Sequence, residues 1–235
     1  MTITIFGTGS FGKLIAKLCP QQTKVNLLSL RALSDAELKD TLERTDILFL
    51  TIPLSAYQKS LARIKTFLKE ETLLVDVCSV KLAPSAKIKE LLPEHKNLLI
   101  THPLFGPQSS KNGTRTEGLS LVLCHKQGEL ADRVISYSKS ILKLKIVEMD
   151  AREHDRQMAN AQALTFFVSE VLSKFKFNDQ ILKTPSFEEL LDLRGLAEKE
   201  STDLLRLIQN DNPFAQELRN KFITEALKIN KKYTS

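Results

Sequence analysis

Ser79 and His102 are the residues whose chemistry draws attention first, because each follows an apolar run typical of a β-strand. Ser79 lies in the segment 76–81, DVCSVK, and His102 lies in the segment 101–113, THPLFGPQSSKNG. A neutral imidazole can accept the proton of an alcohol while a hydride leaves the same carbon. Beside a hydride acceptor the pair would suit the oxidation of an alcohol. If each residue is considered alone, the alternatives are that His102 is structural and that Ser79 caps a helix.

A glycine-rich turn follows the first predicted strand. Gly7, Gly9 and Gly12 have the spacing GxGxxG between the strand-like run Thr2–Phe6 and the helical pattern Phe11–Leu18. Glycine permits the tight turn, the approach of a pyrophosphate to the backbone and the close packing of helix on strand. The phosphates would lie at the N–H groups of the helix N-terminus. The residues expected to bind the cofactor here are Gly7, Thr8, Gly9, Ser10, Phe11 and Gly12. A glycine turn without a ligand is the alternative.

The end of the second predicted strand, Lys24–Ser29, indicates which nicotinamide cofactor fits. Folds that bind NAD usually place Asp or Glu there to hold the ribose 2′-hydroxyl, but the first acidic residue after this strand is Asp35. Ser29 and Arg31 offer a hydroxyl and a guanidinium, which suit a 2′-phosphate. We therefore expect NADP, with NAD as the alternative and with Arg31 then a surface arginine. Thr51, after the third predicted strand, is a further expected cofactor contact.

Strands and helices alternate over residues 1–150 and would position these side chains. The predicted strands are Thr2–Phe6, Lys24–Ser29, Asp46–Thr51, Leu73–Val77, Asn97–Thr101, Leu119–Cys124 and Leu144–Met149. Helical patterns between them include Phe11–Leu18, Ser55–Leu68 and Leu130–Leu142. The alternation predicts an α/β fold with a doubly wound, mostly parallel sheet of the Rossmann type. In such sheets ligands bind beyond the carboxyl ends of the strands, where Ser79 and His102 are expected.

Residues 151–235 show no strand pattern and predict an all-helical second domain. Three long amphipathic helices are expected at Ala151–Phe175, Ser186–Gln209 and Pro213–Lys231, the last with its proline in the first turn. These helices carry more apolar residues than so thin a domain can bury, among them Phe166, Phe167, Val171, Leu190, Leu204, Leu207, Ile208 and Phe222. We therefore expect a homodimer formed through this domain.

Composition and charge narrow the class of protein. Hydrophobic residues make up 42% of the chain and charged residues 26%, as in ordinary folded proteins. Residues 1–150 hold 21 lysines and arginines against 15 acidic residues, whereas residues 151–235 hold 13 of each. The basic surplus suits a cleft that attracts anions or is simply a solvated face. Its dispersal and the lack of tryptophan argue against nucleic acid as a partner.

Apolar runs and cysteine spacing in the sequence indicate cellular location and metal binding. No signal peptide or membrane span is expected from the sequence. The scattered Cys19, Cys78 and Cys124 form neither a disulfide framework nor a zinc motif. We expect a cytoplasmic protein without a metal.

Several strings together resemble the prephenate/arogenate dehydrogenase family. The segments 76–81, DVCSVK, and 101–107, THPLFGP, are similar to its signature segments, and 153–164, EHDRQMANAQAL, is similar to the start of its helical domain. The stretches 109–113, 148–149 and 187–191 resemble most the plant-type arogenate enzymes. The resemblance runs from Ile3 to at least Leu227.

The resemblance implies a Rossmann-type domain, a helical dimerisation domain and an active site in the cleft between them. His102 would hydrogen-bond the ring hydroxyl of a cyclohexadiene acid and act as the base, and Ser79 would fix the same hydroxyl. Lys81 would lie at the edge of the pocket, and Gln162 and Arg194 would contact the substrate. The implied reaction is the nicotinamide-dependent oxidative decarboxylation of arogenate or prephenate in tyrosine biosynthesis. Positioning and one proton acceptor would supply most of the acceleration.

Two departures from the family pattern keep an alternative open. Phe166 stands where many members have histidine, and Leu196 stands where bacterial prephenate enzymes carry an arginine for the substrate carboxylate. Arg194 is nearby but displaced, and an exposed helix arginine is its alternative reading. The alternative for the whole chain is a catalytically silent nucleotide-binding dimer derived from this family.

Overall fold

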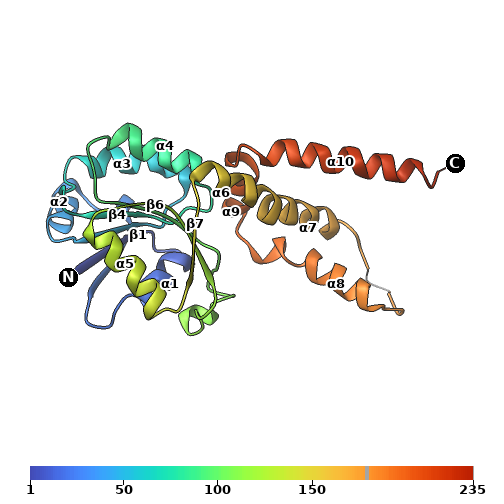
Figure 1. Ribbon diagram of the computed structural model, residues 1–235, viewed down its shortest axis with the longest axis horizontal. Helices are drawn as coiled ribbons and strands as arrows, with labels where there is room; N and C mark the ends of the chain where they lie inside the picture. Colours follow the sequence, from blue (N-terminus) through green and yellow to red (C-terminus); the bar gives the residue numbers. More distant parts are fainter. Residues whose placement is uncertain (178–179, 235) are drawn as a thin grey trace. The chain divides into compact units, whose positions relative to one another are not determined.

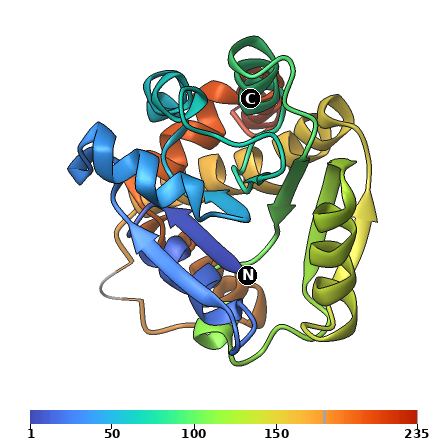
Figure 2. The same ribbon diagram turned by 90° about the vertical axis from the view of Figure 1, so that its left-hand side faces the viewer.

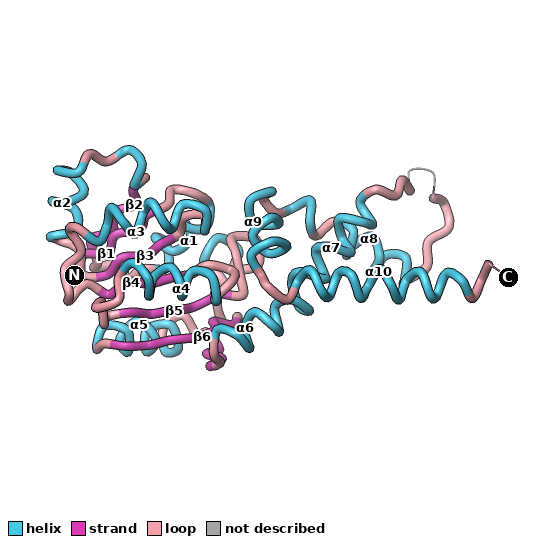
Figure 3. Tube along the Cα trace, turned by 90° about the horizontal axis from the view of Figure 1, so that it is seen from above, coloured by secondary structure: helices cyan, strands magenta, loops and turns pink. Residues whose placement is uncertain are grey.

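The computed structural model describes residues 1–177 and 180–234, and the chain divides into two compact units, Met1–His154 and Asp155–Ser235. The first unit is built on a β-sheet and the second is helical, as the tube colours of Figure 3 show. The units part inside helix α6 (Ala151–Met158), a little beyond the boundary predicted at residue 150.

The first unit contains a seven-stranded sheet in the order β2-β1-β3-β4-β5-β6-β7. Its strands are β1 (Thr2–Phe6), β2 (Lys24–Leu28), β3 (Ile47–Leu50), β4 (Leu73–Asp76), β5 (Leu98–Pro103), β6 (Ser120–Gln127) and β7 (Lys145–Glu148). Neighbours β2, β1, β3, β4 and β5 run parallel, β6 runs antiparallel to β5, and β7 runs parallel to β6. Figure 2 shows β1 and β2 side by side. The mostly parallel α/β sheet predicted from the strand–helix alternation is confirmed.

Five α-helices connect the strands of the first unit. They are α1 (Ser10–Leu18), α2 (Asp35–Glu43), α3 (Tyr57–Lys65), α4 (Leu82–Leu91) and α5 (Glu129–Ser140). Figure 1 shows α3 and α4 on one face of the sheet and α1 and α5 on the other. Because both faces of the central strands are covered, these strands are rich in apolar residues, and β4 is buried at every position.

The core beneath α1 and α5 follows from the alternation of side chains along the strands. Ile3 and Ile5 on β1, Val75 on β4 and Leu99 on β5 are nearly inaccessible and pack with Ile15 of α1. Residues two apart on a strand point to the same face, so these positions form one continuous apolar surface. Packing on that surface fixes the position of α1 over the sheet, and hence the position of the glycine turn that precedes α1.

The second unit consists of helical segments of different lengths. After α6 come the π-helical η4 (Ala159–Leu164), α7 (Thr165–Ser173), α8 (Pro185–Arg194), the 3-10 helix η5 (Ala197–Lys199), α9 (Thr202–Arg206), the π-helical η6 (Leu207–Asp211) and α10 (Ala215–Lys231). Ala163, Ile208 and Ala215 form its small core, with Phe166 and Leu204 packed against them. Part of the apolar surface expected from the sequence is therefore buried by contacts between helices of this unit.

Two helix predictions for the second unit are wrong in detail. The single helix predicted over Ser186–Gln209 is broken, because Gly195 ends α8 and the Ser201 side chain caps α9 by accepting a hydrogen bond from Leu204 N at 3.2 Å. Pro213 precedes the last helix instead of lying in its first turn, since α10 begins at Ala215. Local capping overrode the apolar period in the first of these places.

Among the described residues, no helix is both long enough and apolar enough to span a bilayer.

Candidate active site

The glycine turn between β1 and α1 has the geometry that a pyrophosphate requires. Gly7 has a φ of 128°, and a Cβ there would lie 2.3 Å from the carbonyl oxygen of Thr51. A Cβ on Gly12 would lie 1.9 Å from the carbonyl oxygen of Gly7, whereas one on Gly9 would meet no described atom within 4 Å. Gly9 therefore borders open space at the start of α1, where no side chain caps the helix. The turn fits a phosphate held by backbone N–H groups.

Thr51 supports this turn from the neighbouring strand. Its hydroxyl donates to the carbonyl oxygens of Phe6 and Gly7, both at 3.0 Å, and its backbone N–H donates to Phe6 O at 2.9 Å. The structure thus places Thr51 behind the turn, where it fixes the backbone that would meet the cofactor.

Ser29 and Arg31 follow β2, whose end is joined to the turn by a hydrogen bond from Gly7 N to Leu28 O at 3.0 Å. Ser29 is half-buried, and Arg31 is exposed in the short 3-10 helix η1 (Leu30–Ala32). Within residues 1–177 and 180–234, the Arg31 guanidinium makes no hydrogen bond or ion pair. The cation expected to read a 2′-phosphate is therefore available for one.

His102 lies in β5, opposite Val122 of β6, and its side chain is only 4% exposed. Its Nδ1 lies 2.9 Å from Nε2 of His154, and the two rings meet edge to face. Burial lowers the pKa of His102 well below its usual value, and the charges of Lys81 and His154 lower it further. The imidazole is therefore neutral near pH 7, the state in which it can accept a proton.

Ser79 follows β4, the neighbour of β5, and is half-buried. Asp76, three residues earlier, pairs with Ile100 in the register of the two strands, so Ser79 and His102 both belong to the carboxyl ends of adjacent parallel strands. The structure brings these two expected catalytic residues to the same edge of the sheet.

Lys81, expected at the edge of the substrate pocket, lies inside the first unit. Its side chain is fully buried, and its ammonium pairs with the Asp76 carboxylate and donates to Thr101 O at 2.6 Å. Asp76 also accepts hydrogen bonds from the Tyr57 hydroxyl at 2.5 Å and from Cys78 N at 3.3 Å. A buried carboxylate needs such compensation, and it draws Lys81 inward. The cluster ties the segment after β4 to the residue before His102.

Gln162 and Arg194, the expected substrate contacts, lie in the second unit. Gln162 is half-buried in the π-helical η4, a type of segment that often accompanies functional sites. Arg194 ends α8, and its guanidinium carbon lies 5.8 Å from the centre of the Phe177 ring. Its buried Nε has no hydrogen-bond partner among the described residues.

Sequence reasoning missed the partners of these residues. His154 was part of a recognised string, yet only the fold shows that it meets His102. The partner of Asp76 could have been predicted in kind. An acidic residue at the end of an apolar strand is expected to be buried, and a buried carboxylate needs a compensating partner such as a cation. Arg63, on α3, reaches the loop after β2, and no local pattern in its helix announced this contact.

The parallel sheet, the glycine turn at its carboxyl edge and the basic loop after β2 together define a Rossmann-type dinucleotide-binding protein. The chain belongs to the prephenate dehydrogenase family, because the family model for the prephenate dehydrogenase nucleotide-binding domain matches residues 12–144, more than half of it.

Individual relatives agree with this assignment. The chain is 30% identical to arogenate dehydrogenase 1, chloroplastic, of Arabidopsis thaliana over 94% of its own length and 37% of the relative's. It is 34% identical to arogenate dehydrogenase 2, chloroplastic, of the same plant over 64% of its length and 43% of the relative's. The chain thus spans less than half the length of these relatives.

Solved structures share the fold. The arogenate dehydrogenase of Synechocystis superposes with a TM-score of 0.68 at 19% identity, covering 100% of this chain and 94% of that one. The prephenate dehydrogenase of A. aeolicus, in complex with hydroxyphenyl propionate and NAD+, superposes with a TM-score of 0.71 at 16% identity, covering 99% and 92%. At these identities the likeness establishes the fold alone.

Proposed function

We propose that this protein catalyses the NADP-dependent oxidative decarboxylation of arogenate or prephenate. The observation that carries the proposal is the buried His102, which is neutral near pH 7 and backed by His154, at the strand edge that also carries the glycine turn. Membership of the prephenate dehydrogenase family supports it. No observation favours a catalytically silent protein, so a single candidate reaction is retained.

His102 acts as the base of this reaction. The contact with His154 occupies Nδ1. In the tautomer in which Nδ1–H of His102 donates to the Nε2 lone pair of His154, the Nε2 lone pair of His102 is left to accept the substrate hydroxyl proton. As that proton moves to Nε2, the ring carbon that bears the hydroxyl would give up a hydride, for which the nicotinamide would be the acceptor. The C–C bond between the ring and its carboxylate would break to release carbon dioxide, and the electron pair of that bond would make the ring aromatic. A positioned base of this kind supplies about 10²–10⁴ in rate.

Ser79 and Lys81 assist in different ways. Ser79, at the adjacent strand end, donates a hydrogen bond to the same substrate hydroxyl and so orients it toward His102. Lys81 is held by Asp76 and acts from inside the domain, where its positive charge keeps the pKa of His102 low. This role replaces the direct substrate contact expected from the resemblance.

The cofactor site is formed by the glycine turn and by the end of β2. Backbone N–H groups at the start of α1 hold the pyrophosphate, Ser29 and Arg31 hold the 2′-phosphate, and Thr51 fixes the turn. When bound, NADP supplies the hydride acceptor.

We assign the substrate carboxylates and side chain to Gln162 and Arg194 of the second unit. The unpartnered Nε of Arg194 supports this choice, since an arginine without a carboxylate partner is able to bind one. The displaced position of Arg194, two residues from Leu196, distinguishes this chain from the bacterial family pattern.

One assay tests the function. Purified protein is mixed with arogenate or prephenate and with NADP or NAD, and reduced cofactor and carbon dioxide are measured together with a His102→Asn variant as control. With one of the two substrates, we expect the wild type to form reduced cofactor and carbon dioxide in equal amounts. We expect the His102→Asn variant to form neither. Cofactor binding without turnover of either substrate would contradict the proposal and favour the silent protein.

We further propose a homodimer formed through the second unit. Several apolar side chains of this unit remain exposed, including Val171 on α7 and Phe222, Ile223, Leu227 and Ile229 on α10. Such a surface is unfavourable in water and is typical of an interface, and an isologous pair would cover it. A monomeric mass by light scattering at micromolar concentration would contradict this assembly.

We also propose that the protein works in a reducing compartment such as the cytoplasm. Cys19, Cys78 and Cys124 form no disulfide among the described residues. A reducing environment disfavours disulfide formation. Fractionation of cells that produce the native protein would test this location.

A further inference from the structure

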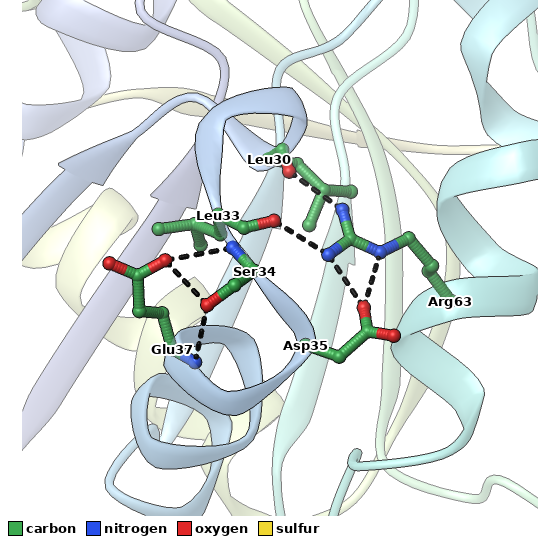
Figure 4. A network of polar contacts seen from close by, with 6 residues as sticks. All are labelled: Leu30, Leu33, Ser34, Asp35, Glu37 and Arg63. Carbon is green, nitrogen blue, oxygen red and sulfur yellow. Dashed lines mark hydrogen bonds and ion pairs between the residues drawn. The ribbon is translucent and has the colours of Figure 1, made fainter.

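The loop between β2 and α2 is held by an arginine from a different part of the chain. Arg63 of α3 donates from Nη1 to Leu30 O at 2.9 Å and from Nη2 to Leu33 O at 2.7 Å. Its Nε and Nη2 also donate to Asp35 Oδ1 at 2.9 and 2.7 Å (Figure 4). One planar guanidinium therefore joins three points of the loop to α3.

The two backbone contacts enclose Arg31. Leu30 and Leu33 lie on either side of it, so fixing their carbonyls fixes the path of the chain that carries the Arg31 side chain. Neither carbonyl accepts a backbone N–H in the described hydrogen bonds, so without Arg63 both would rely on water. A guanidinium suits this task since its donors diverge in one rigid plane.

The ends of the loop are anchored independently. At the β2 end, Gly7 N donates to Leu28 O at 3.0 Å. At the α2 end, Ser34 and Glu37 form a capping box, in which Ser34 N donates to the Glu37 carboxylate at 2.8 Å and Glu37 N donates to Ser34 Oγ at 3.3 Å (Figure 4). With both ends fixed, Arg63 determines the part between them, where Arg31 lies.

Asp35 gives Arg63 a second effect. It is the first acidic residue after β2, and an uncompensated carboxylate near this loop would repel a 2′-phosphate. Both Arg63 donors meet the same carboxylate oxygen of Asp35. The Asp35 side chain is 71% exposed, so the pair contributes little to stability, but it fixes a positive charge beside the acid.

We propose that Arg63 is a positioning residue for cofactor choice: it orders the loop that presents Arg31 to the 2′-phosphate and offsets the charge of Asp35. The inference rests on the NADP preference proposed above. Arg63 itself does not contact the cofactor in this scheme. Its influence on NADP passes through the Leu30 and Leu33 carbonyls and through Asp35.

The test compares cofactor affinities of variants by titration, without turnover. Arg63→Met should weaken NADP binding about tenfold, the equivalent of 1.4 kcal/mol, and change NAD binding less than about twofold. Arg63→Lys should restore little, since an ammonium cannot reproduce the fork. Arg63 lines an open hollow together with Asp35, Lys59, Thr66 and Phe67, so the substitution leaves no buried cavity.

Matched variants separate the causes. Arg44→Met removes a more exposed arginine from a pair with Asp40 and should leave both affinities unchanged. Arg31→Ala combined with Arg63→Met should weaken NADP little more than Arg31→Ala alone, because both act through one contact. Asp35→Asn in the Arg63→Met background should recover the part of the loss that is due to charge.

The role of Arg63, the NADP preference and the proposed reaction can each fail separately in these measurements. Equal weakening of NADP and NAD in Arg63→Met, or unchanged NADP binding, would overturn the positioning role while the NADP preference of the wild type stood. A wild type that binds both cofactors equally would overturn the cofactor proposal and this inference with it. Absence of turnover together with an Arg63-dependent NADP preference would overturn only the reaction.

Discussion

Nδ1 of His102 lies 2.9 Å from Nε2 of His154, and both rings are buried. The contact joins β5 to the first turn of α6 inside the first unit. It leaves His102 one ring nitrogen for chemistry and, in the tautomer proposed above, gives the proton on the other nitrogen an acceptor. When Nε2 takes a proton, the buried imidazolium keeps a hydrogen bond, which reduces the cost of placing its charge in the interior.

Replacing the base itself should stop the reaction while sparing the cofactor. His102→Asn should lower kcat by about 10²–10⁴, because the amide cannot accept the substrate proton. NADP affinity should be retained, since the glycine turn belongs to β1 and α1 and does not contact His102 in the described hydrogen bonds. Steady-state kinetics and cofactor titration measure the two effects. A variant with wild-type turnover would remove His102 from the mechanism.

Replacing the supporting histidine should have a smaller effect of a different kind. His154→Phe removes the acceptor of the Nδ1 proton, a hydrogen bond worth about 0.5–1.5 kcal/mol, and should lower kcat about two- to tenfold. His154→Gln, which keeps an acceptor, should recover part of this loss. The pH profile of kcat should move in the Phe variant and less in the Gln variant. A profile identical to the wild type in both would leave His154 a purely structural role.

The pH dependence of the wild type follows from the burial of His102. Burial, then the charges of Lys81 and His154, lowers the pKa of His102 well below 6.5. The acid limb of kcat/KM should therefore lie below about pH 6.5, with a flat rate through neutrality. A limb centred at or above 6.5 would show that His102 is not held neutral by its surroundings.

Stability should respond to the same group with a definite sign. Below its ordinary pKa of about 6.5, His102 takes a proton in the unfolded chain but not in the folded one. The folded state therefore loses stability as pH falls below that value, and the loss continues until the lowered pKa of the folded state is reached. His102→Gln should weaken this loss in urea unfolding between about pH 7 and pH 5.

The sheet could be predicted because its information is local. Each strand prediction, such as Thr2–Phe6 for β1 or Leu73–Val77 for β4, rested on a short apolar run bounded by helix or turn residues, and the observed bounds differ by a few residues. The glycine turn was equally local, since three glycines and their flanks specify it. The broken helix after α8 was not predictable from the period, because Gly195 and Ser201 act through capping.

In the candidate site, only the reactive residues could be predicted from the sequence, and their contacts could not. His102 and Ser79 carried a chemical signal of their own, whereas the contacts of His102 with His154 and of Arg63 with the loop join residues far apart in the chain. Lys81 shows the limit most plainly. Its place in a recognised string suggested a pocket edge, but the buried Asp76 carboxylate determines where its ammonium lies.

That buried pair leads to a prediction about stability. Lys81→Met leaves the Asp76 carboxylate buried without its cation and should lower the free energy of unfolding by about 3–5 kcal/mol. Adding Asp76→Asn removes the uncompensated charge and should restore a large part of it. Chemical denaturation measures both. As a control, Lys39→Met in the exposed pair with Glu43 should change stability by less than about 1 kcal/mol.

Cofactor choice can be tested at the residues that would touch the 2′-phosphate. A guanidinium–phosphate hydrogen bond contributes about 1.5–3 kcal/mol, which corresponds to roughly a ten- to hundredfold preference for NADP over NAD. Arg31 is exposed and makes no described ion pair, so Arg31→Ala should raise the KM for NADP by this factor and leave that for NAD nearly unchanged.

The reverse change adds a charge in place of removing one. Ser29→Asp should reverse the preference, because a carboxylate at the end of β2 repels the 2′-phosphate and accepts the ribose hydroxyls of NAD. Ser34→Asp, which replaces the capping residue of α2 with another good cap, is the matched control and should keep the preference for NADP. Equal titration of NADP and NAD by the wild type would show that Arg31 points to solvent in the complex as well.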